Sequence, residues 1–165
     1  MPNELATYRN GGVGIRVALC CAVVLLSSCG WQRKLAWQSP DGKSEIEIQQ
    51  KLPINYWGLR VTLTASGKEI VLLEQRGDSA IKFSHVYWEG DGSAVAVYGC
   101  GIQNLSVAYS IKGSRLIPFD RLAGKVAASI RAEYGLPPDK DDKEVFVWTC
   151  SWGEDAFAKK HPNLY

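Results

Sequence analysis

The side chains best suited to covalent or acid–base chemistry in this chain are five cysteines and two histidines. The histidines, His85 and His161, are far apart in sequence, and neither forms a paired-histidine zinc motif. The sequence also contains no Gly-x-Ser-x-Gly elbow and no phosphate-binding glycine loop. We therefore interpret His85 as a structural histidine within a strand, and we expect no catalytic residue, no metal ligand and no cofactor.

The first two cysteines belong to a segment with the layout of a secretory signal. Cys20 and Cys21 lie inside an apolar run, residues 17–26, which follows the cations Arg9 and Arg16. A charged start followed by an apolar core and small residues is typical of such a signal. The run is ten residues long, whereas a helix needs about 20 residues to span a bilayer. We therefore do not expect this segment to form a membrane-spanning helix.

The end of this segment, Leu26-Ser27-Ser28-Cys29, resembles the lipobox of bacterial lipoproteins, in which an aliphatic residue and two small residues precede a cysteine. The resemblance implies that residues 1–28 are removed as a signal peptide. It also implies that Cys29 carries a diacylglyceryl group on its thiol and a fatty acyl chain, such as palmitate, on its new amino group. One acyl chain holds a protein only marginally at a membrane, and three anchor it stably. The alternative is an ordinary signal peptide with a chance cysteine.

The resemblance also carries an expectation about location and domain organisation. Gly30, in place of an aspartate after the cysteine, implies the periplasmic face of the outer membrane. We expect residues 29–36 to be the lipidated anchor and a short tether, and 37–165 to be a single β-rich domain with C-terminal helices. Loss of the signal lowers the formal net charge from +2 to +1. Such a balance offers no basic stripe for nucleic acid, so we expect no nucleic-acid partner.

The two remaining cysteines, Cys100 and Cys150, are expected to form a disulfide. Two thiols in a small domain exported to an oxidising compartment most often pair. Two separately buried thiols and a shared metal ion are the alternatives, although no histidine cluster accompanies these cysteines to complete a metal site.

Most of the domain reads as strands separated by turns. Apolar and polar residues alternate at 45–48, 59–64 and 105–112, which is typical of antiparallel strands with one buried face. Gly-containing turns such as Asp91-Gly92 separate these runs. The pattern predicts an α+β fold, mostly β: a single antiparallel meander of about seven strands, curled or sandwiched, covered by one amphipathic helix.

The covering helix is predicted at residues 120–134. Asp120 is a suitable N-cap, and Gly135 followed by Leu-Pro-Pro is a strong stop. One face carries apolar residues at four-residue spacing: Leu122, Val126, Ile130 and Tyr134. Because the sheet needs a cover for its apolar face, we expect this stripe to be buried against strands of the same chain. A membrane-surface or partner-binding helix is the alternative.

The C-terminal segment is predicted to contain a last strand and a short helix. The β-branched and aromatic residues of 144–150 favour a strand, after a charged, solvated linker at 139–143. Ser151 and Glu154 have the spacing of a capping box, which predicts a helix ending near His161.

A short motif occurs twice in the chain. Trp37-Gln-Ser-Pro-Asp-Gly42 returns, one residue shorter, as Trp88-Glu-Gly-Asp-Gly92. The segment resembles the hairpin turn in blades of periplasmic Tol-type translocation propellers. A propeller needs at least four blades of about 40 residues, so we interpret the repeat as two similar turns in one sheet.

The aromatic residues carry the functional hypothesis. Tyr56, Trp57, Tyr87 and Trp88 are the candidate binding aromatics, with Tyr98, Trp148 and Trp152 in the same class. Tyrosine and tryptophan are enriched in binding patches, although many also fill cores. The sequence thus favours a membrane-anchored, non-enzymatic lipoprotein that binds an envelope protein or polymer. An inhibitor or immunity lipoprotein against a hydrolase or toxin is the first alternative, and an enzyme whose carboxylates meet only in the fold is the second.

Overall fold

Two four-stranded antiparallel sheets and a layer of helices make up the part of the chain that the structure describes. The structure is a computed structural model, and it describes residues 32–51, 58–76, 81–101 and 104–162. The strand order is β1-β2-β3-β4 in the first sheet and β5-β6-β7-β8 in the second. The strands are β1 (Gln32–Gln38), β2 (Ser44–Lys51), β3 (Gly58–Ala65), β4 (Lys68–Arg76), β5 (Ile81–Trp88), β6 (Ala94–Gly101), β7 (Leu105–Ser110) and β8 (Arg115–Ile117). The helices are α2 (Asp120–Tyr134), α3 (Asp142–Ser151) and α4 (Gly153–Lys160).

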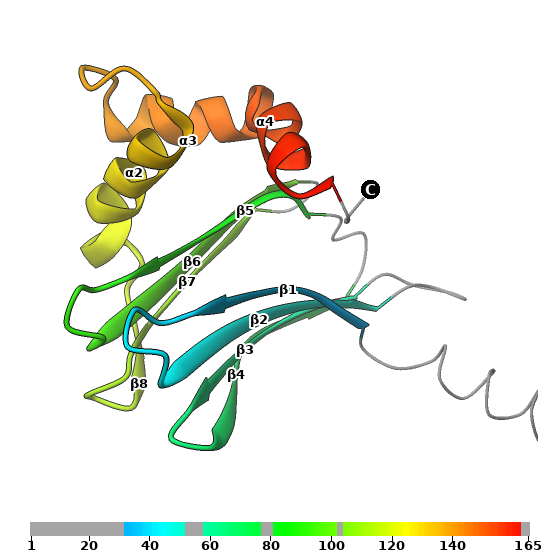
Figure 1. Ribbon diagram of the computed structural model, residues 1–165, viewed down its shortest axis with the longest axis vertical. Helices are drawn as coiled ribbons and strands as arrows, with labels where there is room; N and C mark the ends of the chain where they lie inside the picture. Colours follow the sequence, from blue (N-terminus) through cyan, green and yellow to red (C-terminus); the bar gives the residue numbers. More distant parts are fainter. Residues whose placement is uncertain (1–31, 52–57, 77–80, 102–103, 163–165) are drawn as a thin grey trace, which may run out of the picture. The chain divides into compact units, whose positions relative to one another are not determined.

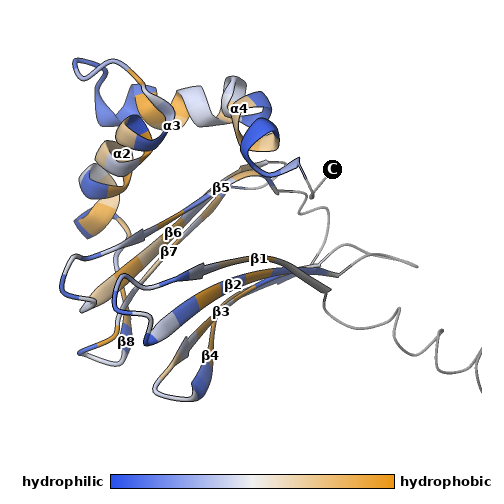
Figure 2. Ribbon diagram, in the orientation of Figure 1, coloured by the Kyte–Doolittle hydropathy of each residue, from blue (hydrophilic) through white to orange (hydrophobic). Residues whose placement is uncertain are grey.

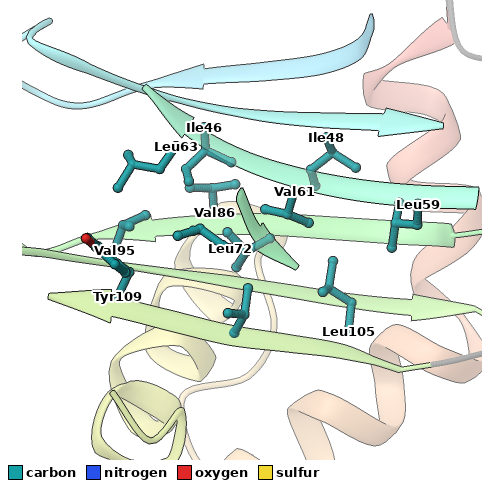
Figure 3. Close-up of a cluster of buried hydrophobic side chains, with 12 residues drawn as sticks. Ile46, Ile48, Leu59, Val61, Leu63, Leu72, Val86, Val95, Leu105 and Tyr109 are labelled. Atoms are coloured by element: carbon teal, nitrogen blue, oxygen red, sulfur yellow. The ribbon is translucent and has the colours of Figure 1, made fainter. Parts of the chain in front are cut away.

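The two sheets pack face to face over one apolar core. Alternate residues of β2, β3, β5, β6 and β7 point into this layer, as the period of two along a strand requires. The fully buried side chains at its centre include Ile46, Val61, Leu63, Val95 and Val97. Figure 3 shows four of them, Ile46, Val61, Leu63 and Val95, between the strands of the two sheets. The first sheet thereby covers one face of the second.

The helices cover the other face of the second sheet (Figure 1). A separate apolar core fills this layer and combines Phe83 of β5 and Ala96 of β6 with Val126 and Ile130 of α2 and Val145 of α3. In Figure 2 the helices carry both hydrophobic and hydrophilic residues, as amphipathic helices on a sheet do. The domain is therefore three-layered, with the second sheet in the middle.

Helix α2 has the predicted bounds and the predicted buried stripe. Leu122, Val126 and Ile130 are at most 5% exposed, and Tyr134 is half-buried. Gly135 ends the helix with φ of 66°, and its N–H donates to the Arg131 carbonyl. The N-cap is wrong by one residue, because Phe119 occupies it and makes no side-chain capping bond.

The strand predicted at 144–150 is wrong, because this segment lies in helix α3. The helix begins with a capping box: Asp141 Oδ1 accepts from the Glu144 N–H at 2.7 Å, and Glu144 Oε2 accepts from the Asp141 N–H at 3.2 Å. Its buried residues, Val145 and Thr149, are four apart, whereas Val147 between them is 58% exposed. The segment thus has the helical period. The charged residues 141–143, predicted as linker, form the cap and first turn.

The short C-terminal helix is present as α4, but it lacks the predicted capping box. Its N-cap is Trp152, which makes no side-chain capping bond. His161 follows the last turn and packs on Phe157, with ring centroids 4.5 Å apart. Burial is the main cause that lowers the pKa of this imidazole.

The single meander of about seven strands is also wrong, since eight strands form two separate sheets and neither is closed. The repeated motif marks the division: it forms the β1–β2 turn that opens the first sheet and the β5–β6 turn that opens the second. Gly42 and Gly92 have φ of 70° and 69°. In each turn the aspartate side chain accepts from the backbone N–H two residues on, Asp41 at 3.1 Å and Asp91 at 3.0 Å. The two turns therefore belong to two sheets.

Candidate functional site

Three of the residues predicted to carry function lie outside the described residues: Cys29, Tyr56 and Trp57. The N-terminal segment 1–28 also lies outside them. Among the helices that are described, none has the length and apolarity required to cross a bilayer.

The other two candidate aromatics, Tyr87 and Trp88, are half-buried and belong to opposite faces of β5. Tyr87 packs in the helix layer, and its hydroxyl donates to Glu89 Oε2 at 3.4 Å. Burial is the main cause that raises the pKa of this phenol. Trp88 packs against the core between the sheets. Because neighbours on a strand point to opposite faces, these two rings do not form one patch.

A disulfide joins Cys100 at the end of β6 to Cys150 at the end of α3, with 5.4 Å between their Cα atoms. It joins a strand to a helix, since residue 150 is helical. Tyr98 supports the same junction: its hydroxyl lies 3.1 Å from Thr149 Oγ1 and 3.7 Å from Cys150 Sγ. The bridge therefore fixes the helix layer on the second sheet.

A groove of about 400 Å³ runs along the outer side of α3; we name it the α3 groove. Its apolar part consists of Val147, Trp148 and Trp152. Trp152 is 71% exposed and Val147 is 58% exposed. Among the other described large hydrophobic residues, only Leu116, at 58%, is as exposed as Val147. Trp148 packs against Tyr134 of α2, and the centroids of the two rings are 5.7 Å apart. The groove thus presents a fixed indole next to an exposed one.

Charged residues of both signs surround this apolar part: Lys140, Asp141, Lys143 and Glu144. Asp141 and Glu144 are held by the capping box that starts α3. Protein-binding surfaces have this arrangement, with tryptophan at an apolar centre and a polar rim. The sequence placed Trp148 and Trp152 among the aromatics of interest, but it gave no sign of the exposure of Val147, because 144–150 was expected to be a strand.

A buried polar network connects β5 to α2. His85 is 4% exposed; its Nδ1 lies 2.9 Å from Glu133 Oε2, and its Nε2 lies 3.0 Å from Ser129 Oγ. The other oxygen of Glu133 accepts from Lys160 of α4. Ser129 and Glu133 are four residues apart on α2 and therefore face the same strand. Sequence spacing could have indicated this pair, but nothing in the sequence places His85 opposite it.

The order serine, histidine, carboxylate matches that of a hydrolytic triad, but its surroundings favour a structural role. Ser129 lies within α2, where the backbone N–H groups that could stabilise an oxyanion bond to carbonyls one turn earlier. Ser129 and His85 do not line the α3 groove. Both imidazole nitrogens have a partner, which satisfies a buried polar group. The arrangement thus connects a strand to two helices.

This network makes the free energy of unfolding depend on pH in the acid range. The hydrogen bond from His85 is the main cause that lowers the pKa of Glu133 to about 2, and Lys160 adds to it. A depressed carboxyl pKa contributes stability above the unfolded value near 4.5, and this contribution is lost as the pH falls towards 2. Because the Glu133 side chain is 30% exposed, we expect about 1–2 kcal/mol after solvent screening.

We therefore expect Glu133→Gln to be less stable than the parent at pH 6, and the difference to shrink as the pH approaches 2.5. Urea unfolding at several pH values measures this. Glu69→Gln, at an exposed position on β4, serves as the control and should show no such convergence. A difference that is independent of pH would mean that the charge of Glu133 does not stabilise the fold.

In the described parts of the chain no group of three or more histidine, cysteine or acidic residues is arranged to hold a metal ion. In comparisons with known proteins, no protein-family model, no curated protein and no solved structure matches this chain.

Proposed function

We propose that this protein is a lipid-anchored lipoprotein of the bacterial cell envelope, whose folded domain binds a partner protein without catalysing a reaction. The lipobox-like end of the N-terminal segment, Leu26-Ser27-Ser28-Cys29, supports the anchor. A disulfide between Cys100 and Cys150 is consistent with an oxidising compartment such as the periplasm. The outer-membrane location rests on Gly30 after the lipidated cysteine.

One observation carries the binding role: the exposure of Trp152 and Val147 in the α3 groove. Trp152 is 71% exposed, so its indole does not contribute the stabilising free energy that burial in a core would provide. Exposed apolar groups with a polar rim mark interaction sites. A protein partner fits this groove because its centre is apolar, with Val147 beside two indoles, and its rim carries both signs of charge, which complementary charges of a protein can pair with.

The anchor and the binding surface can be tested in the same full-length chain. With a palmitate analogue as label, we expect the parent to be labelled and Cys29→Ala to accumulate as unlabelled, uncleaved precursor. Label that persists in Cys29→Ala would contradict the lipid assignment.

For the surface, chemical cross-linking in intact cells should give a discrete complex that is lost in the double variant Val147→Ala, Trp152→Ala. Val71→Ala is the matched control, since Val71 is 48% exposed on the first sheet. A complex that survives in the double variant would remove the α3 groove from the proposal. Sedimentation with purified cell-wall polymer that the double variant abolishes would instead identify a polymer as the partner.

A further inference from the structure

A second depression, of about 350 Å³, lies at the end of the second sheet where α2 begins; we name it the basic pocket. It is lined by Ser93, Ala94, Ser110, Lys112, Gly113, Arg115, Ile117 and Arg121. Three of these residues are cations, two carry hydroxyl groups, and none is acidic. The composition differs from that of the α3 groove, where both signs of charge occur.

The β7–β8 turn brings most of these groups together. Ser114 adopts φ of 48°, and its N–H donates to the Ile111 carbonyl at 3.2 Å. The turn is tied to the start of β6, because the Ser93 carbonyl accepts from the N–H groups of Ile111 and Lys112 at 2.9 and 3.3 Å. Lys112 therefore lies in the same pocket as Ser93, although nineteen residues separate them in the sequence. Hydrogen bonds of the backbone hold the pocket in this form.

The cations of the basic pocket differ from those around the helices. Four ion pairs involve residues of the helices: Lys82 with Glu154, Lys125 with Glu89, Arg131 with Asp142 and Lys160 with Glu133. In contrast, no carboxylate of the described residues lies within 4.0 Å of a charged nitrogen of Lys112, Arg115 or Arg121. Three like charges around one depression repel each other unless an anion joins them.

One of the two hydroxyl groups, that of Ser110, is oriented by a neighbour and can still donate. Ser110 Oγ accepts from the Gly113 N–H at 3.0 Å, which leaves its own hydrogen for a further acceptor. An acidic residue, Asp91, lies beside this pocket without lining it, and its Oδ1 accepts from the Ser93 N–H at 3.0 Å. A hydrogen bond from the Ser93 side chain is the main cause that lowers the pKa of Asp91, and the charge of Lys112 adds to it. The side chains that line the basic pocket therefore offer more hydrogen-bond donors than acceptors.

We propose that the basic pocket binds a phosphate ester. Arginine presents a planar fork of N–H donors that matches the oxygens of a phosphate, and lysine adds a point charge. Two arginines, one lysine and the Ser110 hydroxyl can together satisfy an ester that carries two negative charges. The depression, of about 350 Å³, has room for a phosphate together with a small organic group, and such an ester can be a phosphorylated sugar or the headgroup of a phospholipid.

This site does not depend on the proposed partner surface or on the lipid anchor. The basic pocket and the α3 groove share no lining residue. Loss of phosphate binding with an intact cross-linked complex, or the reverse, would therefore distinguish the two proposals.

The test uses the purified full-length chain at low salt, because screening weakens such contacts as the salt concentration rises. Calorimetric titration with glucose 1-phosphate should show binding, and titration with glucose should not. The double variant Arg115→Gln, Arg121→Gln should weaken the affinity for glucose 1-phosphate by about tenfold or more. Lys68→Gln, at an exposed position on β4 far from the pocket in sequence, is the matched control and should bind like the parent.

A steric variant tests the pocket without a change of charge. A methyl group at Gly113 would lie 3.0 Å from Ser110 Oγ and 3.7 Å from Arg115 Cγ. Gly113→Ala should therefore also weaken binding, and a thermal unfolding midpoint close to that of the parent shows that the fold is retained.

Flotation with vesicles distinguishes the two sources of the phosphate in a chain of residues 30–165, which contains every described residue but neither the apolar N-terminal segment nor the lipidation site. Binding to vesicles of phosphatidylglycerol but not of phosphatidylcholine, lost in the double arginine variant, would identify a lipid headgroup. Binding to glucose 1-phosphate alone would identify a free phosphate ester. No binding to either probe, or binding that is unaffected by the loss of both arginines, would overturn the proposal.

Discussion

Replacing both Cys100 and Cys150 by alanine is expected to lower the free energy of unfolding by about 4 kcal/mol. The bridge closes a loop with a sequence separation of 50 residues. Cross-linking such a loop restricts the unfolded chain and thereby favours the folded one. Urea denaturation of the parent and the double variant, extrapolated to water, measures the difference.

Reduction of the parent with a thiol reagent should give the same loss, because it opens the same loop. Cys29→Ala is the control, since that cysteine is expected to take no part in the bridge. A loss below about 1 kcal/mol would mean that the contacts of Tyr98 with α3 already hold the helix layer in place. Partial unfolding confined to the helix layer would appear as a second transition.

Truncation of Ile130 to alanine is expected to cost about 2–5 kcal/mol. Ile130 is 0% exposed and belongs to the core between α2 and the second sheet. Removal of its side-chain carbons leaves a cavity that neighbouring elements can fill only in part. Chemical denaturation of the folded domain measures the change.

Val147→Ala on α3 is the matched control, because Val147 is an aliphatic residue of a neighbouring helix that is 58% exposed. We expect its effect to stay within about 0.5 kcal/mol, as for most surface substitutions. A change of that small size for Ile130→Ala, with loss of membrane or partner binding instead, would contradict the burial of the α2 stripe.

The sequence predicted α2 well because two independent signals agree there. Four apolar residues recur at the helical period, and Gly135 followed by prolines stops the helix. The strand pattern was equally informative for β2, where the alternation of buried and less buried residues is clean. It also located β3 and β7, although Thr62 of β3 and Ala108 of β7 are buried on the face that was expected to be wet. Local period and local stop signals were sufficient for these elements.

Segment 144–150 shows where such signals mislead. Its β-branched and aromatic residues favour a strand. The segment nevertheless forms helix α3, because a capping box at Asp141 and Glu144 starts the helix and only one side of it is buried. The same tertiary dependence hides the candidate site. The groove exists because α3 exposes Val147, and the His85 network exists because β5 lies against α2. Neither fact can be read from spacing along the chain.

The division into two sheets was missed for a similar reason. Each hairpin is local, and the sequence indicated most of them. The alternation of apolar and polar residues along a strand, however, does not indicate which hairpins belong to the same sheet. The repeated turn at Asp41 and Asp91 was the available sign, because it opens each sheet in the same way.

The connectivity of the sheets has a consequence for the order in which the chain folds. Every strand pairs only with a strand adjacent to it in sequence, so each sheet can form from hairpins, which close in roughly 1–10 μs. The helix layer requires contacts of much longer range, such as Lys82 with Glu154 across 72 residues. Cys150 can therefore pair with Cys100 only after α3 has been made and lies against the second sheet. A disulfide between these two cysteines thus reports that α3 has docked on the second sheet.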